Sequence, residues 1–178
     1  MIYVFFANGF EEIEAITTVD ILKRAEFSVV TIGVGGKTIV GAHGIPVTTD
    51  LLDKEICLSE DLQAIVLPGG MPGTLNLEKS VFVKNAIQYI HEQNKLIAAI
   101  CAAPSILGHL GLLNGKSATC FPGFEQELSG ANLSCERVVK DGNIITAKGA
   151  GAAVLFALEI VAFLTSRERA EKIKDSLQ

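Results

Sequence analysis

Two short segments of the chain are apolar at every position, and each one stops abruptly at a turn. Ala64–Leu67 runs directly into Pro68-Gly69-Gly70, and Leu96–Ile100 runs directly into Cys101. Strands that are buried on both faces have such continuous apolar sequences, and they belong to parallel sheets covered by helices on both sides. The two segments therefore predict a central parallel sheet.

Helical periodicity alternates with strand-like runs along the rest of the chain. Residues 2–7 and 28–34 are typical of strands, and the segment between them repeats apolar side chains at helical spacing. The apolar positions of that helix are Ile13, Ile16, Val19 and Leu22. Strands that alternate with helices predict right-handed crossovers and an open α/β sandwich.

The remaining segments fit the same plan. Residues 37–50 predict an irregular β excursion, because their glycines and Pro46 limit a regular ladder. Asp141-Gly142, which residues 136–139 and 143–147 flank, predicts a hairpin, and a long Ala-rich helix follows from about Ala150. Since no repeat or linker interrupts the chain, we expect one domain over residues 1–178.

Charge and hydropathy exclude several classes of protein. The chain has 15 Lys and Arg against 20 Asp and Glu, a net charge of −5, and no basic stripe, which argues against nucleic-acid binding. Its most apolar stretch, residues 150–164, contains Glu159 and is shorter than the ~20 residues that span a bilayer. No basic segment precedes the first apolar run, so we expect no membrane association and a cytoplasmic location.

The four cysteines have no CxxC spacing and no histidine at a metal-ligand spacing, so we expect free thiols and no metal. Cys101 stands out because it lies between a buried strand and the start of a helix. A residue there can be held outward on a strained turn, and a helix N-terminus lowers the pKa of a thiol. The alternative is a buried structural cysteine without chemistry.

Two further features could assist such a thiol. The N–H groups of Gly69, Gly70 and Ala102 could hold a developing oxyanion, although a Gly-Gly turn can also serve only to allow positive φ. Glu11 and Glu12 lie at the start of the first helix. The helix dipole favours carboxylates at this end, so we expect both residues to act as caps. Glu14 lies at the edge of the apolar stripe and could instead exchange a proton with Cys101.

Four motifs together resemble the ThiJ/PfpI superfamily, in the branch of the Parkinson-linked protein deglycase and its bacterial relatives. They are residues 5–14 (FFANGFEEIE), 66–70 (VLPGG), 97–104 (IAAICAAP) and 141–146 (DGNIIT), in order along nearly the whole chain. The resemblance implies a flavodoxin-like three-layer sandwich, a domain of the class I glutamine amidotransferase type, and a homodimer. It assigns the nucleophile to Cys101, its carboxyl partner to Glu14, and the oxyanion donors to Gly70 and Ala102.

The sequence departs from the family pattern at two positions. Members with a catalytic histidine carry it directly before a proline, where this chain has Phe121 before Pro122, so a Cys/His dyad is not expected. The intracellular-protease branch has histidine directly after the nucleophile, where this chain has Ala102, and proteolysis is therefore disfavoured. A thiazole-biosynthesis role has no supporting motif.

The resemblance gives further residues an interpretation. His43 resembles the position from which the family sends a polar side chain toward the cysteine of the second protomer. Cys120 borders the site and could act as a redox partner of Cys101, whereas Cys57 and Cys135 are expected to have no special chemistry. His91 is expected to be solvated, and His109 is expected at the surface or at an interface.

Two functions are compatible with these residues. The first is a cofactor-free glyoxalase or protein deglycase, a lyase or hydrolase in which the Cys101 thiolate attacks a small 2-oxoaldehyde or its adducts, with weak turnover because Phe121 replaces histidine. The second is an oxidative-stress sensor or redox-regulated chaperone that uses the same cysteine.

Overall fold

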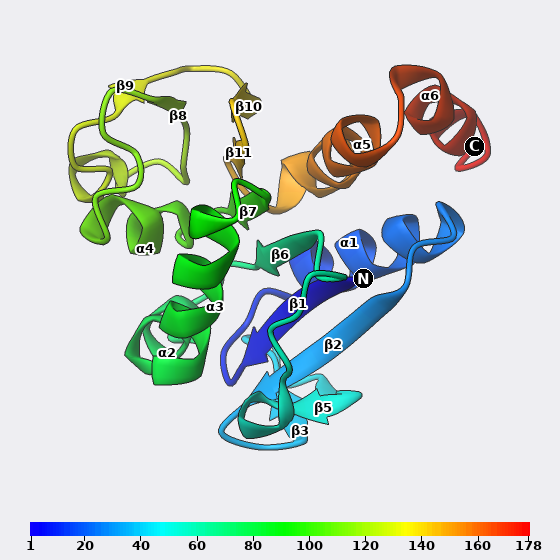
Figure 1. The fold of residues 1–178 in the computed structure, drawn as a ribbon, viewed down its shortest axis with the longest axis vertical. Helices are drawn as coiled ribbons and strands as arrows, with labels where there is room; N and C mark the ends of the chain where they lie inside the picture. The colour runs from blue at the N-terminus through cyan, green and yellow to red at the C-terminus, as the bar shows by residue number, and fades with distance from the viewer.

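The computed structural model describes residues 1–178 and is built on one seven-stranded sheet (Figure 1). The strand order is β10-β11-β7-β6-β1-β2-β5. The strands are β1 (Ile2–Ala7), β2 (Val29–Val34), β5 (Leu51–Leu52), β6 (Ala64–Leu67), β7 (Leu96–Ile100), β10 (Val138–Asp141) and β11 (Ile144–Ala147). All neighbours pair in parallel except β10 and β11. The two apolar segments form the adjacent inner strands β6 and β7, and every residue in them is buried.

Six α-helices cover the sheet on both faces, which confirms the predicted flavodoxin-like three-layer sandwich (Figure 1). One apolar core lies beneath α1 (Glu12–Arg24), α5 (Ala153–Leu164) and α6 (Arg167–Asp175). The other lies beneath α2 (Gly73–Lys79), α3 (Val81–Glu92) and α4 (Pro104–His109). None of these helices combines the length and apolar character that crossing a membrane requires.

Small elements fill the connections. The excursion at 37–50 contains only a short antiparallel hairpin of β3 (Thr38–Val40) and β4 (Pro46–Thr48), as its glycines predict. A second small ladder pairs β8 (Ser117–Ala118) in parallel with β9 (Asn132–Leu133). The single-turn 3₁₀ helices are η1 (Asp53–Glu55), η2 (Glu125–Glu127) and η3 (Ala150–Ala152). The predicted hairpin of β10 and β11 is present, but its turn is Gly142-Asn143, because Asp141 still pairs with Ile144.

The buried face of α1 differs from the one its apolar spacing predicts. Ile13 and Ile16 are 56% and 43% exposed, whereas Ala15, Ile21 and Leu22 enter the core. The helix packs on α5 and on β1 and β2. The face buried by these contacts carries small and large apolar side chains together with Glu14. Two isoleucines are therefore left at the surface near the start of the helix.

Candidate active site at the carboxyl edge of the sheet

Cys101 follows β7 on a turn that few residue types adopt. Its φ is +66°, in the left-handed region that is costly for a non-glycine residue. Its N–H donates to the Ala147 carbonyl at 2.9 Å, and its own carbonyl accepts from the Phe121 N–H at 2.8 Å. Bonds to β11 and to the 119–122 segment thus hold the strained backbone, and the strained turn predicted from the sequence is present.

Glu14 is brought to Cys101 by the first turn of α1. Its side chain is almost completely buried, and Oε2 accepts a hydrogen bond from the Gly69 N–H at 2.8 Å. The Glu11 carboxylate caps the helix by accepting from the Glu14 N–H at 2.7 Å. Oε1 is buried without a close hydrogen-bond partner, although the Cys101 thiol and the Ala150 N–H lie near enough to influence the Glu14 pKa.

The three predicted backbone donors divide into two roles. The N–H groups of Gly70 and Ala102 act to lower the pKa of the Cys101 thiol and so favour a negative charge on its sulfur. The Gly69 N–H donates to Glu14 and is not free to bind an oxyanion. The prediction that Gly69 is an oxyanion donor is contradicted by this hydrogen bond. Gly69 also needs to be glycine, because an added Cβ would lie 2.5 Å from Cys101 Cβ.

Burial dominates the protonation of this pair. It raises the pKa of Glu14 to about 7, although the hydrogen bond from Gly69 opposes the shift. Burial and the adjacent Glu14 carboxylate raise the pKa of Cys101 to about 12, against the N–H groups of Gly70 and Ala102. The expectation of a lowered thiol pKa is therefore wrong for the resting site. A proton shared between the two groups must move to Glu14 before the sulfur becomes a strong nucleophile.

A fourth strand end contributes to the site, and the sequence interpretation did not include it. After β11 the chain continues through Lys148, Gly149 and Ala150, and this segment lines a cavity of about 350 Å³ together with Phe121. Phe121 and Glu14 Oε1 both lie next to Gly149. Parallel strands have their carboxyl ends at one edge of the sheet. Gly149, shortly after β11, could therefore have indicated from the sequence that this segment reaches the site.

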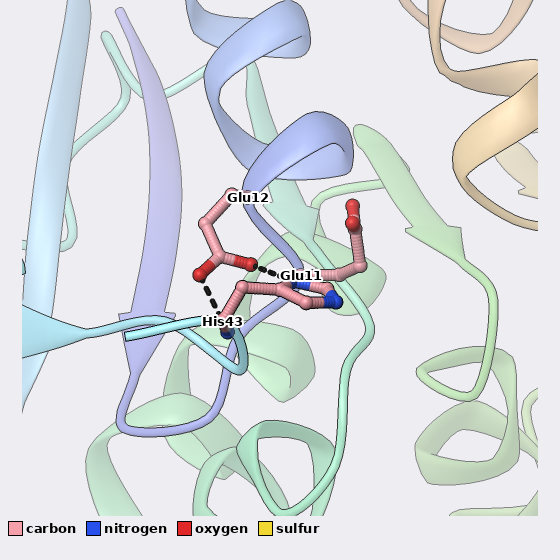
Figure 2. A group of neighbouring side chains, drawn as sticks. All are labelled: Glu11, Glu12 and His43. Atoms are coloured by element: carbon pink, nitrogen blue, oxygen red, sulfur yellow. Dashed lines mark hydrogen bonds and ion pairs between the residues drawn. The ribbon is translucent and has the colours of Figure 1, made fainter. Parts of the chain in front are cut away.

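His43 lies at the tip of the β3–β4 hairpin and contacts its own chain. Its backbone N–H donates to Glu12 Oε1 and its ring Nδ1 contacts Glu12 Oε2, both at 2.7 Å (Figure 2). The hydrogen bond to Glu12 raises the pKa of His43. Burial acts to raise the pKa of Glu12, yet the hydrogen bonds from His43 outweigh it and the Glu12 pKa is lowered. Glu12 therefore holds the hairpin, and the predicted capping role belongs to Glu11 alone.

Glu11, Glu12 and His43 also form the one grouping with spacing suited to a metal ion, with ligand atoms within 4.8 Å of one another (Figure 2). Their atoms are already paired, because Glu11 caps α1 and both Glu12 oxygens bond to His43. The positive end of the helix dipole also disfavours a cation there. Glu11 therefore serves as the helix cap, and the contact between Glu12 and His43 is a clamp that holds the β3–β4 hairpin on α1.

The remaining predicted residues are Cys120, His91 and His109. Cys120 is buried in the core beneath α3 and α4, whereas Cys101 packs against the core on the other face of the sheet. His91 is exposed, as expected. His109 is also a surface residue, with its ring between the carboxylates of Glu78 and Glu127.

The fold and this edge define an α/β sandwich with a cysteine on a strained turn beside a buried carboxyl group. The chain belongs to the DJ-1/PfpI family, whose sequence model matches residues 1–163. The resemblance predicted from the four motifs is confirmed.

Individual relatives match over nearly the whole chain. Protein dj-1beta of Drosophila melanogaster is 34% identical over 177 residues, covering 98% of this chain and 94% of the fly protein. The Parkinson disease protein 7 homolog of Danio rerio is 34% identical over 178 residues, with 98% and 94% covered. Oxidized DJ-1 of Toxoplasma gondii has a TM-score of 0.94 at 33% identity, covering 99% of this chain and 96% of that structure.

Proposed function

We propose that the protein is a cysteine-dependent, cofactor-free enzyme that converts small 2-oxoaldehydes, or their adducts with amines and thiols, into 2-hydroxy acids. The observation that carries the proposal is the arrangement of Cys101 on its strained turn beside the buried Glu14, where the N–H groups of Gly70 and Ala102 act to lower the pKa of the thiol. A nucleophile, a proton carrier and a charge-stabilising pair of donors are the groups that carbonyl addition requires.

The reaction begins when the Cys101 proton moves to Glu14 as the sulfur attacks the aldehyde carbon. A carbon–sulfur bond forms and the carbonyl oxygen becomes an oxyanion, which the Gly70 and Ala102 N–H groups stabilise until it takes the proton from Glu14 and leaves Glu14 as a carboxylate. Glu14 then takes the proton from this carbon and returns it to the neighbouring ketone carbon. The first carbon is thereby oxidised to a thioester and the second reduced to an alcohol. Water cleaves the thioester, releasing the 2-hydroxy acid and the thiol.

The pKa of Glu14 suits this exchange, because a group that titrates at about 7 can both accept and return a proton near neutral pH. Phe121 supplies no second proton carrier at the cavity wall, and we therefore expect slow turnover.

Methylglyoxal supplied to the wild type should yield lactate, and Cys101→Ala should abolish it. Cys57→Ala is a matched control, since Cys57 is exposed and lies outside the site. Equal rates in wild type and Cys101→Ala would refute the mechanism.

A second function of the same cysteine is supported by the buried Glu14 oxygen. Oε1 has no close partner, and a Glu14 that is protonated near pH 7 could donate to a sulfinate on Cys101. Such a protein would act as an oxidation sensor or redox-regulated chaperone. Mild peroxide would then add about 32 Da at Cys101, and Glu14→Ala would lose this product. Oxidation distributed equally over all four cysteines would exclude sensing at this site.

We further propose that a second copy of the chain covers the exposed apolar surface beside the β3–β4 hairpin. This surface contains Ile13 and Ile16 of α1, with Val40 and Ile45 of the hairpin that Glu12 attaches to the helix. Exposed apolar groups that share one surface mark association sites, and the contact between Glu12 and His43 holds these two elements together. A homodimer formed here would cover His43 and could bring it to the second protomer. Ile16→Glu should yield a monomer in size-exclusion chromatography, and an unchanged elution volume would contradict the interface.

A further inference from the structure

Two cysteines outside the candidate active site lie on the wall of one cavity. Cys120 and Cys135 both line a cavity of about 260 Å³ between the segments that follow β8 and β9. Cys120 is 4% exposed, whereas Cys135 is open to solvent. A buried thiol and an accessible thiol therefore share one small space.

The pairing of the two short strands explains why these cysteines line one cavity. Ala118 lies opposite Leu133 in the parallel ladder, and the Ser134 N–H donates to the Ala118 carbonyl at 2.9 Å. Cys120 is two residues beyond Ala118, and Cys135 is two residues beyond Leu133. The ladder itself ends at Ala118 and Leu133, and equal offsets from a parallel pair carry the two cysteines the same distance along the neighbouring segments that follow it.

Cys101 is a less suitable partner for Cys120. The Cys120 side chain lies in the core beneath α3 and α4, whereas Cys101 packs against the core on the opposite face of the sheet. The Cys101 thiol also interacts with the Glu14 carboxyl group. Cys101 also lines none of the cavity that Cys120 and Cys135 share. The cavity and the strand register both favour Cys135.

We propose that Cys120 and Cys135 are a redox pair, which hydrogen peroxide closes into a disulfide. The accessible Cys135 thiolate attacks a peroxide oxygen, giving a sulfenic acid and a hydroxide that is protonated to water. The Cys120 sulfur then attacks the Cys135 sulfur, the sulfur–oxygen bond breaks, and the Cys120 proton leaves with the hydroxide as a second water. Two thiols lose two electrons, and one peroxide is reduced to two waters.

The surroundings of Cys120 assign the order of these steps. Burial raises the pKa of Cys120 to about 11, the Glu125 carboxylate adds to the shift, and Lys148 opposes it. Cys120 therefore remains a thiol at neutral pH and does not react first with peroxide. The next residue, Phe121, bonds to the Cys101 carbonyl, so the pair lies directly beside the wall of the candidate active site.

Peptide masses of the folded protein test the pair. After brief peroxide treatment and alkylation of the remaining thiols, trypsin should release residues 117–137, which contain Cys120 and Cys135 and no other cysteine. We expect this peptide without alkylation and about 2 Da lighter than its reduced form. Further cleavage after Glu125 and Glu127 should leave two cysteine-containing fragments that separate only on reduction.

Two variants separate the pair from the chemistry at Cys101. Cys101→Ala should form the link at the wild-type rate, so failure of the proposed enzyme would leave this result unaffected. Cys135→Ser, at an exposed position that folding should tolerate, should leave Cys120 reduced and available to alkylation after unfolding. Any of three results would overturn the pair: a 117–137 peptide that stays fully reduced or gains only oxygen, a link that joins Cys101 to Cys120, or closure that is no faster in the folded protein than in denaturant.

Discussion

The Gly69 N–H donates to Glu14 Oε2 at 2.8 Å, so the turn after β6 holds a carboxyl group of α1 against the cysteine that follows β7. Residues from three separate elements, α1 and the turns after β6 and β7, thus lie together at the site. The close approach explains why a glycine is required at this turn, and the burial of the carboxyl group raises the pKa of Glu14 to about 7 against the hydrogen bond from Gly69.

Gly69→Ala should damage both the site and the stability of the fold. The added methyl group would lie 2.5 Å from Cys101 Cβ and 2.8 Å from Glu14 Oε2, distances that require the backbone to move. We expect a loss of about 1–3 kcal/mol in the free energy of unfolding, measured by urea denaturation. Gly36→Ala is the matched control, because its nearest atom would lie at an ordinary 3.6 Å. Equal effects of the two substitutions would contradict the crowding at Gly69.

Glu14→Gln should stabilise the protein at alkaline pH. The pKa of Glu14 is about 7 in the folded protein against 4.5 without burial, so between these values the folded state binds a proton that the unfolded state lacks. Stability should therefore fall as the pH rises from 4.5 to 7. The interval corresponds to about 3 kcal/mol, at about 1.4 kcal/mol per pKa unit.

Urea titrations of wild type and Glu14→Gln between pH 4 and 8 would measure this difference. The advantage of the variant should be largest above pH 7 and vanish below pH 4.5. A difference in the free energy of unfolding that does not change with pH would mean that burial does not raise the pKa of Glu14.

Glu12→Gln should lower the pKa of His43. The contact with Glu12 raises this pKa above 6.5, so its contribution to stability is present below 6.5 and is lost as the pH rises through the raised value. Titration of the histidine ring signals by NMR would measure the change. His109, whose pKa is raised by Glu78 and Glu127, is the internal control and should not move. An unchanged His43 titration would show that the clamp does not exist in solution.

Phe121→His should increase the proposed conversion of methylglyoxal. The ring of Phe121 lies at the cavity wall near Gly149 and Glu14, and it is 47% exposed, so a smaller ring can be accommodated. A second proton carrier there should raise kcat by about tenfold or more. Phe121→Leu, which adds no titratable group, should not. If both variants behave alike, proton transfer at this position does not limit the rate.

The plan of the fold could be derived from local patterns. The apolar segments of β6 and β7, the turn signals after them and the alternation with helices specify a parallel sheet covered on both faces, because burial on two sides demands such sequences. The position of Cys101 after β7 also follows, since strand ends collect at one edge of the sheet.

Other properties depend on which surfaces meet. Ile13 and Ile16 have the spacing of a buried stripe, yet packing on α5 buries Ala15 and Ile21 and leaves the two isoleucines exposed. The Cys101 thiol lies near a helix start, but burial and Glu14 raise its pKa rather than lower it. Spacing along the chain describes the neighbours within one element. The energies of burial and of charge pairs depend on atoms that distant segments bring together, and only the tertiary structure decides these.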